Sequence, residues 1–286
     1  MISTLKRTAR QGLNAIQKSL AKNIDYLHTQ SPYNKLMAEL HTKADFTQYA
    51  PYTQYREEFE QKIKELGSAY VKLGGIKYHL NRFKGNLSFR EAGTNDSGLN
   101  ARMRFCLSII KSYFPGAQTA YLAEHDTVFH QVVAAQTTLQ LTTSYYKPGA
   151  PLHQDLTALT YPDNAFDVSL SFEDLEHIPD YKKAVAELFR VTKKGGHVLL
   201  STPFVIENDK TLVRATIDST GKITHLQTPE YHGDPMNPQG ILCFYHFGWD
   251  LLDDFRKAGF SAVKIITGYD TGKMMLGLQL FIMAQK

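Results

Sequence analysis

A strand–helix–strand pattern between residues 166 and 204 constrains the fold of this chain more than any other stretch. Residues 166–172, FDVSLSF, form an apolar run of strand length that follows the turn-forming sequence PDN at 162–164. A second apolar run, HVLLSTPF, covers residues 197–204. Two such strands joined by one helix predict a right-handed crossover within a parallel sheet.

The connecting helix is predicted to begin at Pro179, because the missing N–H of a proline costs nothing in the first turn. Apolar residues then recur at helical spacing as far as Val191. Lys193 and Lys194 occupy the predicted last turn, and the glycines at 195–196 are expected to end the helix.

The carboxyl end of the first strand is expected to carry the chemistry, because ligands of open α/β sheets bind beyond the carboxyl ends of the strands. Three acids and a histidine fall there within five residues, directly after Ser171 and Phe172: Glu173, Asp174, Glu176 and His177. The alternative for Asp174 and Glu176 is that they stabilise the start of a helix. That alternative applies less to Glu173.

The motifs LSFEDLEHIPD and ELFRVTKKGGHVLLSTPF, with a helix and two late strands after residue 248, resemble class I S-adenosylmethionine-dependent methyltransferases. The resemblance covers about residues 119–286. It implies a Rossmann-like seven-stranded, mainly parallel sheet with helices on both faces, and S-adenosylmethionine as the cofactor. It also implies that Asp155 and Leu156 contact the adenine and that Ser171 and Phe172 lie at the cofactor rim.

The first turn of the sheet departs from that family. The family carries an acidic residue and a glycine-rich turn between its first strand and helix, whereas this chain has EHDT at residues 124–127. Glu124 is expected to take the acidic role. Thr127 or Asp126 is expected to cap the following helix, and Thr127 is counted among the cofactor-binding residues.

The next strand ends in Ser144 and Tyr145, where the family has an acid that binds both ribose hydroxyls. A tyrosine cannot accept two hydrogen bonds from a diol as a carboxylate does, so the ribose is expected to be held differently. The chain also resembles a smaller methyltransferase-like subgroup with a degenerate first turn. The shared motifs are LNAR at 99–102, PEYHGDP at 229–235 and CFYHFGW at 243–249.

Residues 205–247 are an insertion that contains a predicted hairpin turning at 219–221. Four acid–base groups follow the hairpin: Glu230, Tyr231, His232 and Asp234. His232 and His246 are candidate bases because histidine titrates near neutrality. The alternative is a structured loop whose histidines bond to backbone. A metal site that joins this run to His177 is less favoured, and we predict no metal.

Residues 1–115 are predicted to form an N-terminal, mainly helical cap with a small hairpin, followed by the Rossmann-like domain at 116–286. Residues 1–30 have the pattern of a basic amphipathic helix. Such a helix can lie on a membrane or direct entry into an organelle. The alternative, which is favoured, is that it packs on its own domain or on a second subunit. Residues 31–67 are expected to continue as helix. The hairpin is expected within residues 73–91.

The charge, apolar runs and cysteine content of the chain limit the kinds of partner and setting that are expected. A net charge of +4 gives no argument for nucleic acid, and no apolar run reaches the length of a membrane span. Cys106 and Cys243 are far apart and form no metal-type pair, which favours a reducing, cytoplasmic setting. A homodimer is an option.

The leading hypothesis is in-line transfer of a methyl group to a small-molecule acceptor. The acceptor's proton would go to Glu173, His177, His232 or Tyr245, and Arg102 would pair with the cofactor carboxylate. The first alternative is a cyclase that converts S-adenosylmethionine to azetidine-2-carboxylate and methylthioadenosine. The second alternative is a non-catalytic binding module that keeps the methyltransferase fold.

Overall fold

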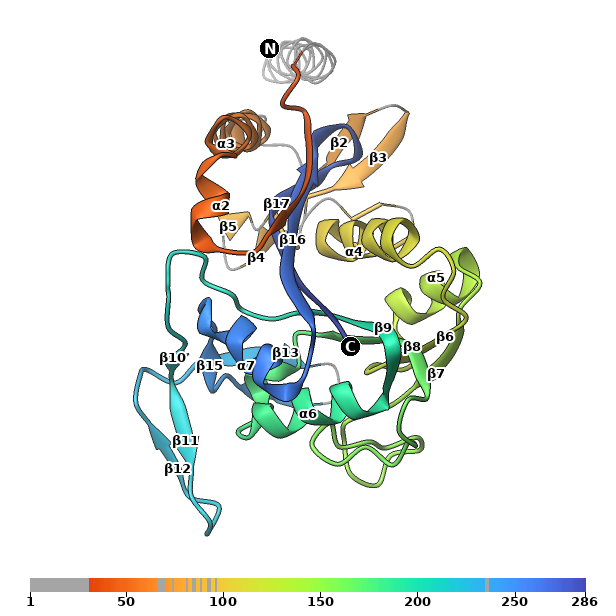
Figure 1. Ribbon diagram of the computed structural model, residues 1–286. Coiled ribbons are helices and arrows are strands. Elements are labelled where there is room, and N and C mark those ends of the chain that lie inside the picture. Colours follow the sequence, from red (N-terminus) through yellow and green to blue (C-terminus); the bar gives the residue numbers. More distant parts are fainter. Residues whose placement is uncertain are drawn as a thin grey trace, which may run out of the picture. The chain divides into compact units, whose positions relative to one another are not determined.

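The computed structural model describes residues 31–65, 70–73, 75–80, 82–83, 86–87, 89–91, 94–95, 97–234 and 237–286 (Figure 1). The basic helix expected at residues 1–30 lies outside the described residues. The chain divides into two compact units. Of the described residues, the first unit holds those within 31–38, 48–108 and 267–279, and the second holds 39–47, those within 109–266, and 280–286. The boundary expected near residue 115 stays a prediction.

A seven-stranded mixed sheet runs through the chain in the order β1-β16-β17-β9-β8-β6-β7. Its strands are β1 (Lys35–Leu40), β6 (Thr119–Leu122), β7 (Gln140–Thr143), β8 (Phe166–Phe172), β9 (Thr192–Ser201), β16 (Ala262–Asp270) and β17 (Met275–Gln285). The pairs β6–β7, β6–β8 and β8–β9 are parallel, whereas β17 pairs with β9 in the antiparallel sense. The expectation of a seven-stranded, mainly parallel sheet with helices is confirmed.

The strand β1 corrects the expectation that residues 31–67 are helical. Its sequence KLMAEL consists largely of good helix formers, but its side chains alternate between buried and less buried, as in a strand. Leu36, Ala38 and Leu40 are the buried positions. Pairing with β16 therefore overrides the local preference, and helix is limited in this stretch to α2 (Lys43–Thr47) and α3 (Ala50–Glu65).

The helices of the second unit include α5 (Val128–Gln136), α6 (Tyr181–Val191) and α7 (Asp250–Ala258), with the short η1 (Leu175–His177) after β8. The helix α6 buries the side chains of Ala184, Val185, Leu188 and Val191 on one face. It ends at Val191 because Thr192 is extended and already pairs with Phe166 of β8. The placement of Lys193 and Lys194 in the last helical turn was therefore wrong, since both belong to β9.

The first unit contains α3, the hairpin β2 (Tyr70–Leu73) and β3 (Ile76–His79), and the short pair β4 (Arg82–Phe83) and β5 (Asn86–Leu87). The turn η2 (Thr271–Lys273) also lies here, and α4 (Ala101–Tyr113) begins in this unit. Its core joins α3 to the hairpin through Phe59, Ile63, Val71, Leu73 and Tyr78, with Met274 and Leu276. The unit therefore has an apolar core of its own.

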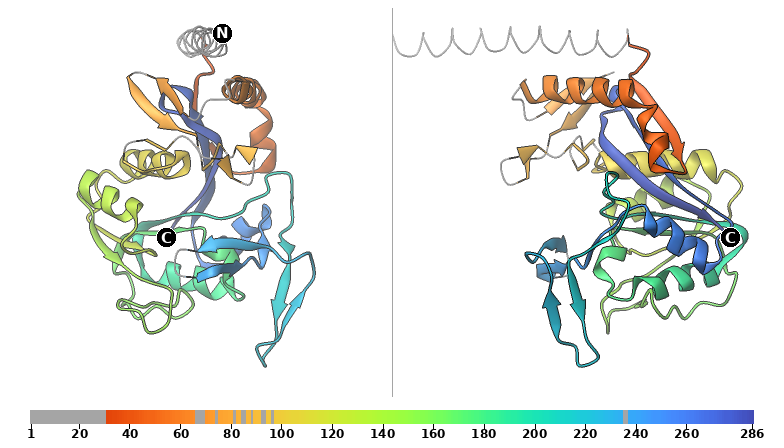
Figure 2. Two further views of the ribbon diagram at one scale, coloured as in Figure 1. Left: turned by 180° about the vertical axis from the view of Figure 1, so that it is seen from behind. Right: turned by 60° about the vertical axis from the view of Figure 1, so that its left-hand side comes forward.

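The insertion of the second unit forms β10 (Leu212–Val213), β11 (Ala215–Ile217), β12 (Ile223–His225), β13 (Tyr231–Asp234), β14 (Asn237–Leu242) and β15 (Tyr245–His246). The predicted hairpin is confirmed, because Ile217 pairs with Ile223 across the turn. This hairpin protrudes, and both isoleucines are exposed (Figure 2).

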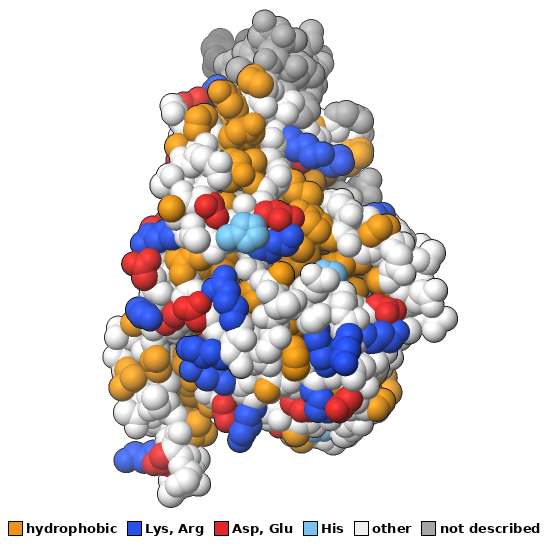
Figure 3. All heavy atoms as spheres, in the orientation of Figure 1, with side chains coloured by type: hydrophobic (Ala, Val, Ile, Leu, Met, Phe, Trp, Pro, Cys, Tyr) orange, Lys and Arg blue, Asp and Glu red, His pale blue; other side chains and the backbone are white. Residues whose placement is uncertain are grey.

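Charged side chains of both signs are interspersed on the face drawn in Figure 3. In the part of the chain that the structure describes, no helix has the length and apolar character needed to cross a membrane.

Candidate functional site

The carboxyl ends of β6, β7 and β8 meet at one edge of the sheet. In the parallel register Leu122 lies beside both Thr143 and Leu170. The last residues of these strands and the residues that follow them therefore lie along the same edge. Most of the sequence-predicted cofactor residues are among them: Glu124, Thr127, Ser144, Tyr145, Ser171 and Phe172.

The turn after β6 is held by side chains in place of glycines. Asp126 adopts a left-handed φ of 56°, a conformation that glycine takes without strain and that Asp tolerates better than most residues. Its backbone N–H donates to His130 Nδ1 at 3.2 Å. Thr127 Oγ1 accepts from the backbone N–H of His130 at 3.0 Å, so the expected capping of α5 by Thr127 is confirmed.

The residues after β7 are engaged within the protein. The Ser144 hydroxyl is buried and lies 2.8 Å from the hydroxyl of Tyr121, whose pKa is raised by burial. The Tyr145 ring packs edge-on against His125 at 5.0 Å between centroids. Ser144 thus shares its hydroxyl with Tyr121, and a ribose at this position would have to compete with that bond.

Asp155 and Leu156 lie in the loop after β7, which a bridge between Tyr145 and His153 ties to the end of that strand. Asp155 is exposed, and its Oδ1 accepts from both the backbone N–H and the hydroxyl of Thr157 at 2.8 Å. These two bonds fix the carboxylate in a local turn.

Glu173, the first residue after β8, is held in a strained conformation against β9. Its φ is 60°, in the left-handed region that an unbranched acid seldom adopts. The backbone N–H of Glu173 donates to Ser201 O at 2.8 Å, and its Oε1 accepts from Ser201 Oγ at 2.7 Å. Two bonds to one residue therefore fix both the backbone and the carboxylate.

The sequence placed Asp174 at the carboxyl end of the strand that is now β8, but did not indicate it as an acid–base group. Its Oδ2 accepts from Ser171 Oγ at 2.7 Å and from the backbone N–H of Phe172 at 3.1 Å. Burial, with the nearby charges of Glu176 and Glu124, nevertheless raises the pKa of Asp174 to about 8. Asp174 stands at the N-cap position of η1, as the helix-start alternative expected, but its side chain makes no capping hydrogen bond to that turn.

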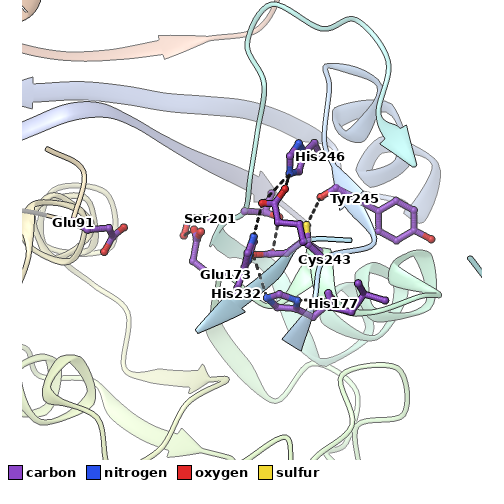
Figure 4. Close-up of polar contacts among 12 residues, drawn as sticks. Glu91, Glu173, His177, Ser201, His232, Cys243, Tyr245 and His246 are labelled. Carbon is purple, nitrogen blue, oxygen red and sulfur yellow. Dashed lines mark hydrogen bonds and ion pairs between the residues drawn. The ribbon is translucent and has the colours of Figure 1, made fainter. Parts of the chain in front are cut away.

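The structure brings the rings of His177 and His232 together, with 4.9 Å between their centroids (Figure 4). Glu176 is fully buried, and its Oε1 lies 3.6 Å from His177 Nε2 and 3.4 Å from His232 Nδ1. Hydrogen bonding to Cys243, and then to Glu176 and Glu230, raises the pKa of His232 to about 11.

Glu230 and His246 extend this cluster. Glu230 Oε1 lies 3.0 Å from His232 Nε2, and its Oε2 lies 3.2 Å from His246 Nε2 and 3.0 Å from Arg214 Nη2. The sequence alternative, in which the histidines of this loop bond to backbone, does not describe His232 and His246, because both contact carboxylates. His177 Nδ1, outside that loop, lies 2.8 Å from Leu242 O.

Tyr245 does not join the two histidines. Its hydroxyl donates to Pro179 O at 2.6 Å, and its ring stacks on Phe247 at 5.5 Å and points away from His232 (Figure 4). Burial raises the pKa of Tyr245. These contacts favour a packing role at the start of α6.

Arg102 lies in the first unit and pairs with a protein carboxylate. Its Nε donates to Glu91 Oε1 at 3.1 Å, and Asn100 Nδ2 donates to the other oxygen of Glu91. Asn100 also accepts from the backbone N–H of Met103 at 2.9 Å and so caps α4. The Arg102 guanidinium, which was expected to bind the cofactor carboxylate, is thus already paired with Glu91.

Comparison with known proteins supports the methyltransferase resemblance. A family model described as a methyltransferase domain matches residues 114–200. A probable S-adenosylmethionine-dependent methyltransferase of Mycolicibacterium smegmatis is 43% identical over 51 residues, 18% of this chain and 20% of that protein. A demethylmenaquinone methyltransferase of Anoxybacillus flavithermus is 32% identical over 122 residues, 40% of this chain and 49% of that protein.

Similar solved structures include a putative S-adenosylmethionine-dependent methyltransferase from Listeria monocytogenes. It is 14% identical with a TM-score of 0.41, and the match covers 65% of this chain and 98% of that one. The [4+2]-cyclase SpnF is 20% identical with a TM-score of 0.38, covering 57% and 59% of the two chains. Likeness at these scores supports no inference about function.

The resemblance to class I S-adenosylmethionine-dependent methyltransferases is therefore confirmed, with residues 114–200 matching their methyltransferase domain. The chain spans only a fifth to a half of the length of the curated relatives described here. S-adenosylmethionine is the cofactor that this resemblance implies.

The edge of the sheet fits this cofactor in part. Glu124 supplies a carboxylate just beyond β6, and Phe172 supplies a half-buried aromatic ring at the end of β8. A carboxylate suits the cofactor's ammonium group, and an aromatic face suits its sulfonium. The position after β7 fits less well, because Tyr121 engages the Ser144 hydroxyl.

Proposed function

We propose that this protein transfers the methyl group of S-adenosylmethionine to a small-molecule acceptor. The match of residues 114–200 to a methyltransferase domain carries the proposal. The convergence of Glu124, Ser171 and Phe172 at one edge of the sheet supports it, because ligands of such sheets bind there.

The roles of the residues follow from their positions. Glu124 would bind the amino group of the methionine portion, Asp155 and Leu156 would contact the adenine, and Phe172 would face the sulfonium. The sulfonium supplies its own leaving group, so the protein's main task is to position and desolvate the two reactants.

The acceptor's proton would go to Glu173. The Glu173 carboxylate is fixed by Ser201 Oγ. A carboxylate held in one orientation is suited to accept a proton, because general base catalysis depends first on geometry. His177 and His232 are weaker candidates, because the two ring nitrogens of each already face protein groups: Leu242 O and Glu176 for His177, and Glu176 and Glu230 for His232.

The test measures ligand binding and products separately. We expect S-adenosylhomocysteine to bind the full-length chain with a Kd in the range of about 1–100 µM by calorimetry, comparable to ordinary substrate affinities. Incubation with S-adenosylmethionine and a panel of small phenols, amines and carboxylic acids should release S-adenosylhomocysteine only when an acceptor is present.

Two other outcomes would overturn the proposal. Methylthioadenosine formed without any acceptor would assign the cyclase reaction, in which the amino group of S-adenosylmethionine displaces methylthioadenosine from its own γ-carbon. Absence of binding to both S-adenosylmethionine and S-adenosylhomocysteine would leave only a binding module of methyltransferase fold.

A further inference from the structure

We propose that Glu176, His177 and His232 form a divalent-metal site of the two-histidine, one-carboxylate type. One potential ligand atom of each residue lies within 4.8 Å of the others. We take these atoms to be Glu176 Oε1, His177 Nε2 and His232 Nδ1, which the short distances to Glu176 favour. The Oε1 atom is 3.6 Å from His177 Nε2 and 3.4 Å from His232 Nδ1. Atoms that bind tetrahedral zinc at about 2.0–2.1 Å are roughly 3.3–3.4 Å apart, so the geometry accepts an ion with little movement.

The environment of the Glu176 carboxylate favours a bound cation. Glu176 has no exposed surface, and its Oε1 makes no well-formed hydrogen bond among the described residues; its polar neighbours are His177 Nε2 at 3.6 Å and His232 Nδ1 at 3.4 Å. An unsatisfied buried polar atom is costly, and a buried charge is costlier still unless it is paired or binds a metal. An ion at the three-atom site would satisfy this oxygen directly.

The remote atom of each ligand is already anchored. His177 Nδ1 lies 2.8 Å from Leu242 O, His232 Nε2 lies 3.0 Å from Glu230 Oε1, and Glu176 Oε2 accepts from Thr202 Oγ1 at 2.9 Å. Metal-binding histidines usually donate their second N–H to a carbonyl or carboxylate, which fixes the ring and its tautomer. The outer contacts here match that arrangement for both histidines.

A second group of potential ligands shares His232 but is less suited to an ion. It consists of Glu230, His232 and Cys243. Glu230 already contacts Arg214 and His246, and Cys243 donates its S–H to Tyr245 O at 3.3 Å. Binding here would require these contacts to break and the thiol to lose its proton, so the site with Glu176 is favoured.

The donor set indicates the kind of ion. Two imidazole nitrogens and one carboxylate oxygen are the ligands of catalytic zinc sites, which keep a fourth position for water or substrate. The site does not depend on the proposed methyl transfer. It replaces the preference, drawn from the sequence, for no metal in this region.

The test is a zinc titration of the full-length chain after treatment with a chelator. We expect one Zn²⁺ per chain with a Kd below about 1 µM by calorimetry. His177→Ala and His232→Ala should each weaken binding by at least about 100-fold, and Thr202→Val, which removes an outer contact, by about tenfold. Far-UV circular dichroism of each variant checks that the fold is retained.

Two matched variants separate this site from the alternatives. His225→Ala removes an exposed histidine of β12 and should leave the zinc affinity unchanged; an equal loss there would indicate only adventitious surface binding. Cys243→Ser should also leave the affinity unchanged, and loss of binding in this variant would overturn the proposal in favour of the second ligand group.

X-ray absorption of the zinc-loaded unmodified chain tests the donor set without any substitution. We expect only nitrogen and oxygen neighbours, with the signature of two imidazoles. A sulfur neighbour, or a chain that retains no zinc, would overturn the proposal even if the ligand variants fail to fold.

Discussion

The acids at the two ends of strand β8 differ in how completely they are hydrogen-bonded and in the direction in which their pKa is shifted. At the amino end, Asp167 accepts at Oδ2 from the backbone N–H groups of Gln118 and Thr119, at 3.0 and 2.8 Å, and from Thr119 Oγ1 at 2.9 Å. Its Oδ1 accepts from Lys193 Nζ at 2.8 Å. Burial alone would raise the pKa of Asp167, but these bonds outweigh it and hold the pKa well below its usual range.

At the carboxyl end three acids are crowded together, and one of them is incompletely hydrogen-bonded. Burial raises the pKa of Asp174, Glu173 is held at a left-handed φ, and Glu176 keeps one buried oxygen without a hydrogen bond. The acid at the amino end therefore stabilises the sheet. At the carboxyl end, a strained backbone and an unsatisfied oxygen lower stability but leave groups that are suited to bind or react.

The largest expected effect is at the amino end, where Gly196→Val should destabilise the protein by about 3 kcal/mol. A Cβ at Gly196 would lie 2.7 Å from Asp167 O and 2.9 Å from Lys193 O, both backbone atoms. Urea denaturation measures the change. Gly116→Ala is the control, because no atom of the described residues lies within 4 Å of its added Cβ. Equal midpoints for the two variants would contradict close packing at this end.

Asp167→Asn should cost about 2 kcal/mol at pH 7, since it removes a charge that accepts several hydrogen bonds. The folded pKa of Asp167 is depressed, so its stabilisation is present above the unfolded value of about 4 and is lost as pH falls through the folded value. The difference between the two proteins should therefore shrink in denaturation measured below pH 4.

The exposed pair of Asp163 with Arg190 gives a matched control for that experiment. Asp163→Asn should change stability by less than about 1 kcal/mol, as is usual for exposed ion pairs. A pH-independent loss in Asp167→Asn would contradict the ionised role of this acid.

At the carboxyl end, Glu124→Gln should weaken S-adenosylhomocysteine binding about tenfold, or about 1.4 kcal/mol, because it removes the carboxylate expected to bind the ammonium group. Calorimetry on folded protein measures the change. Asp167→Asn should keep the affinity of the unmodified chain, since it lies at the opposite end of β8. An equal loss of S-adenosylhomocysteine affinity in both variants would contradict the view that the carboxyl end binds the cofactor and the amino end only stabilises the sheet.

The smallest expected effect concerns the turn after β6. Asp126→Val should destabilise the protein by about 1 kcal/mol, because a β-branched residue fits poorly at a φ of 56°. Asp126→Gly should be close to neutral, since glycine adopts this conformation readily. Thermal or urea unfolding distinguishes the two, and equal stability of the variants would show that the turn relaxes.

Several local features were accessible from the sequence. The strand FDVSLSF ends where expected, Thr127 caps α5, and the hairpin of β11 and β12 turns at the predicted residues. In each case the signal is an apolar run, a capping hydroxyl or a turn sequence that acts within a few residues. Such signals survive folding when nothing distant competes with them.

Other features depended on distant partners. Residues 35–40 form a strand because they pair with β16. The helix α6 ends at Val191 because Thr192 pairs with Phe166 of β8. The sequence named His177 and His232 separately, but only the fold places both beside Glu176.

The sequence by itself determined the α/β pattern and the edge of the sheet at which polar groups gather, because periodicity and strand direction are local properties. The tertiary structure decided which of those groups are paired, which carry shifted pKa values and which oxygen stays unsatisfied. Burial and electrostatic environment are set by residues far apart in the chain, so no local pattern encodes them.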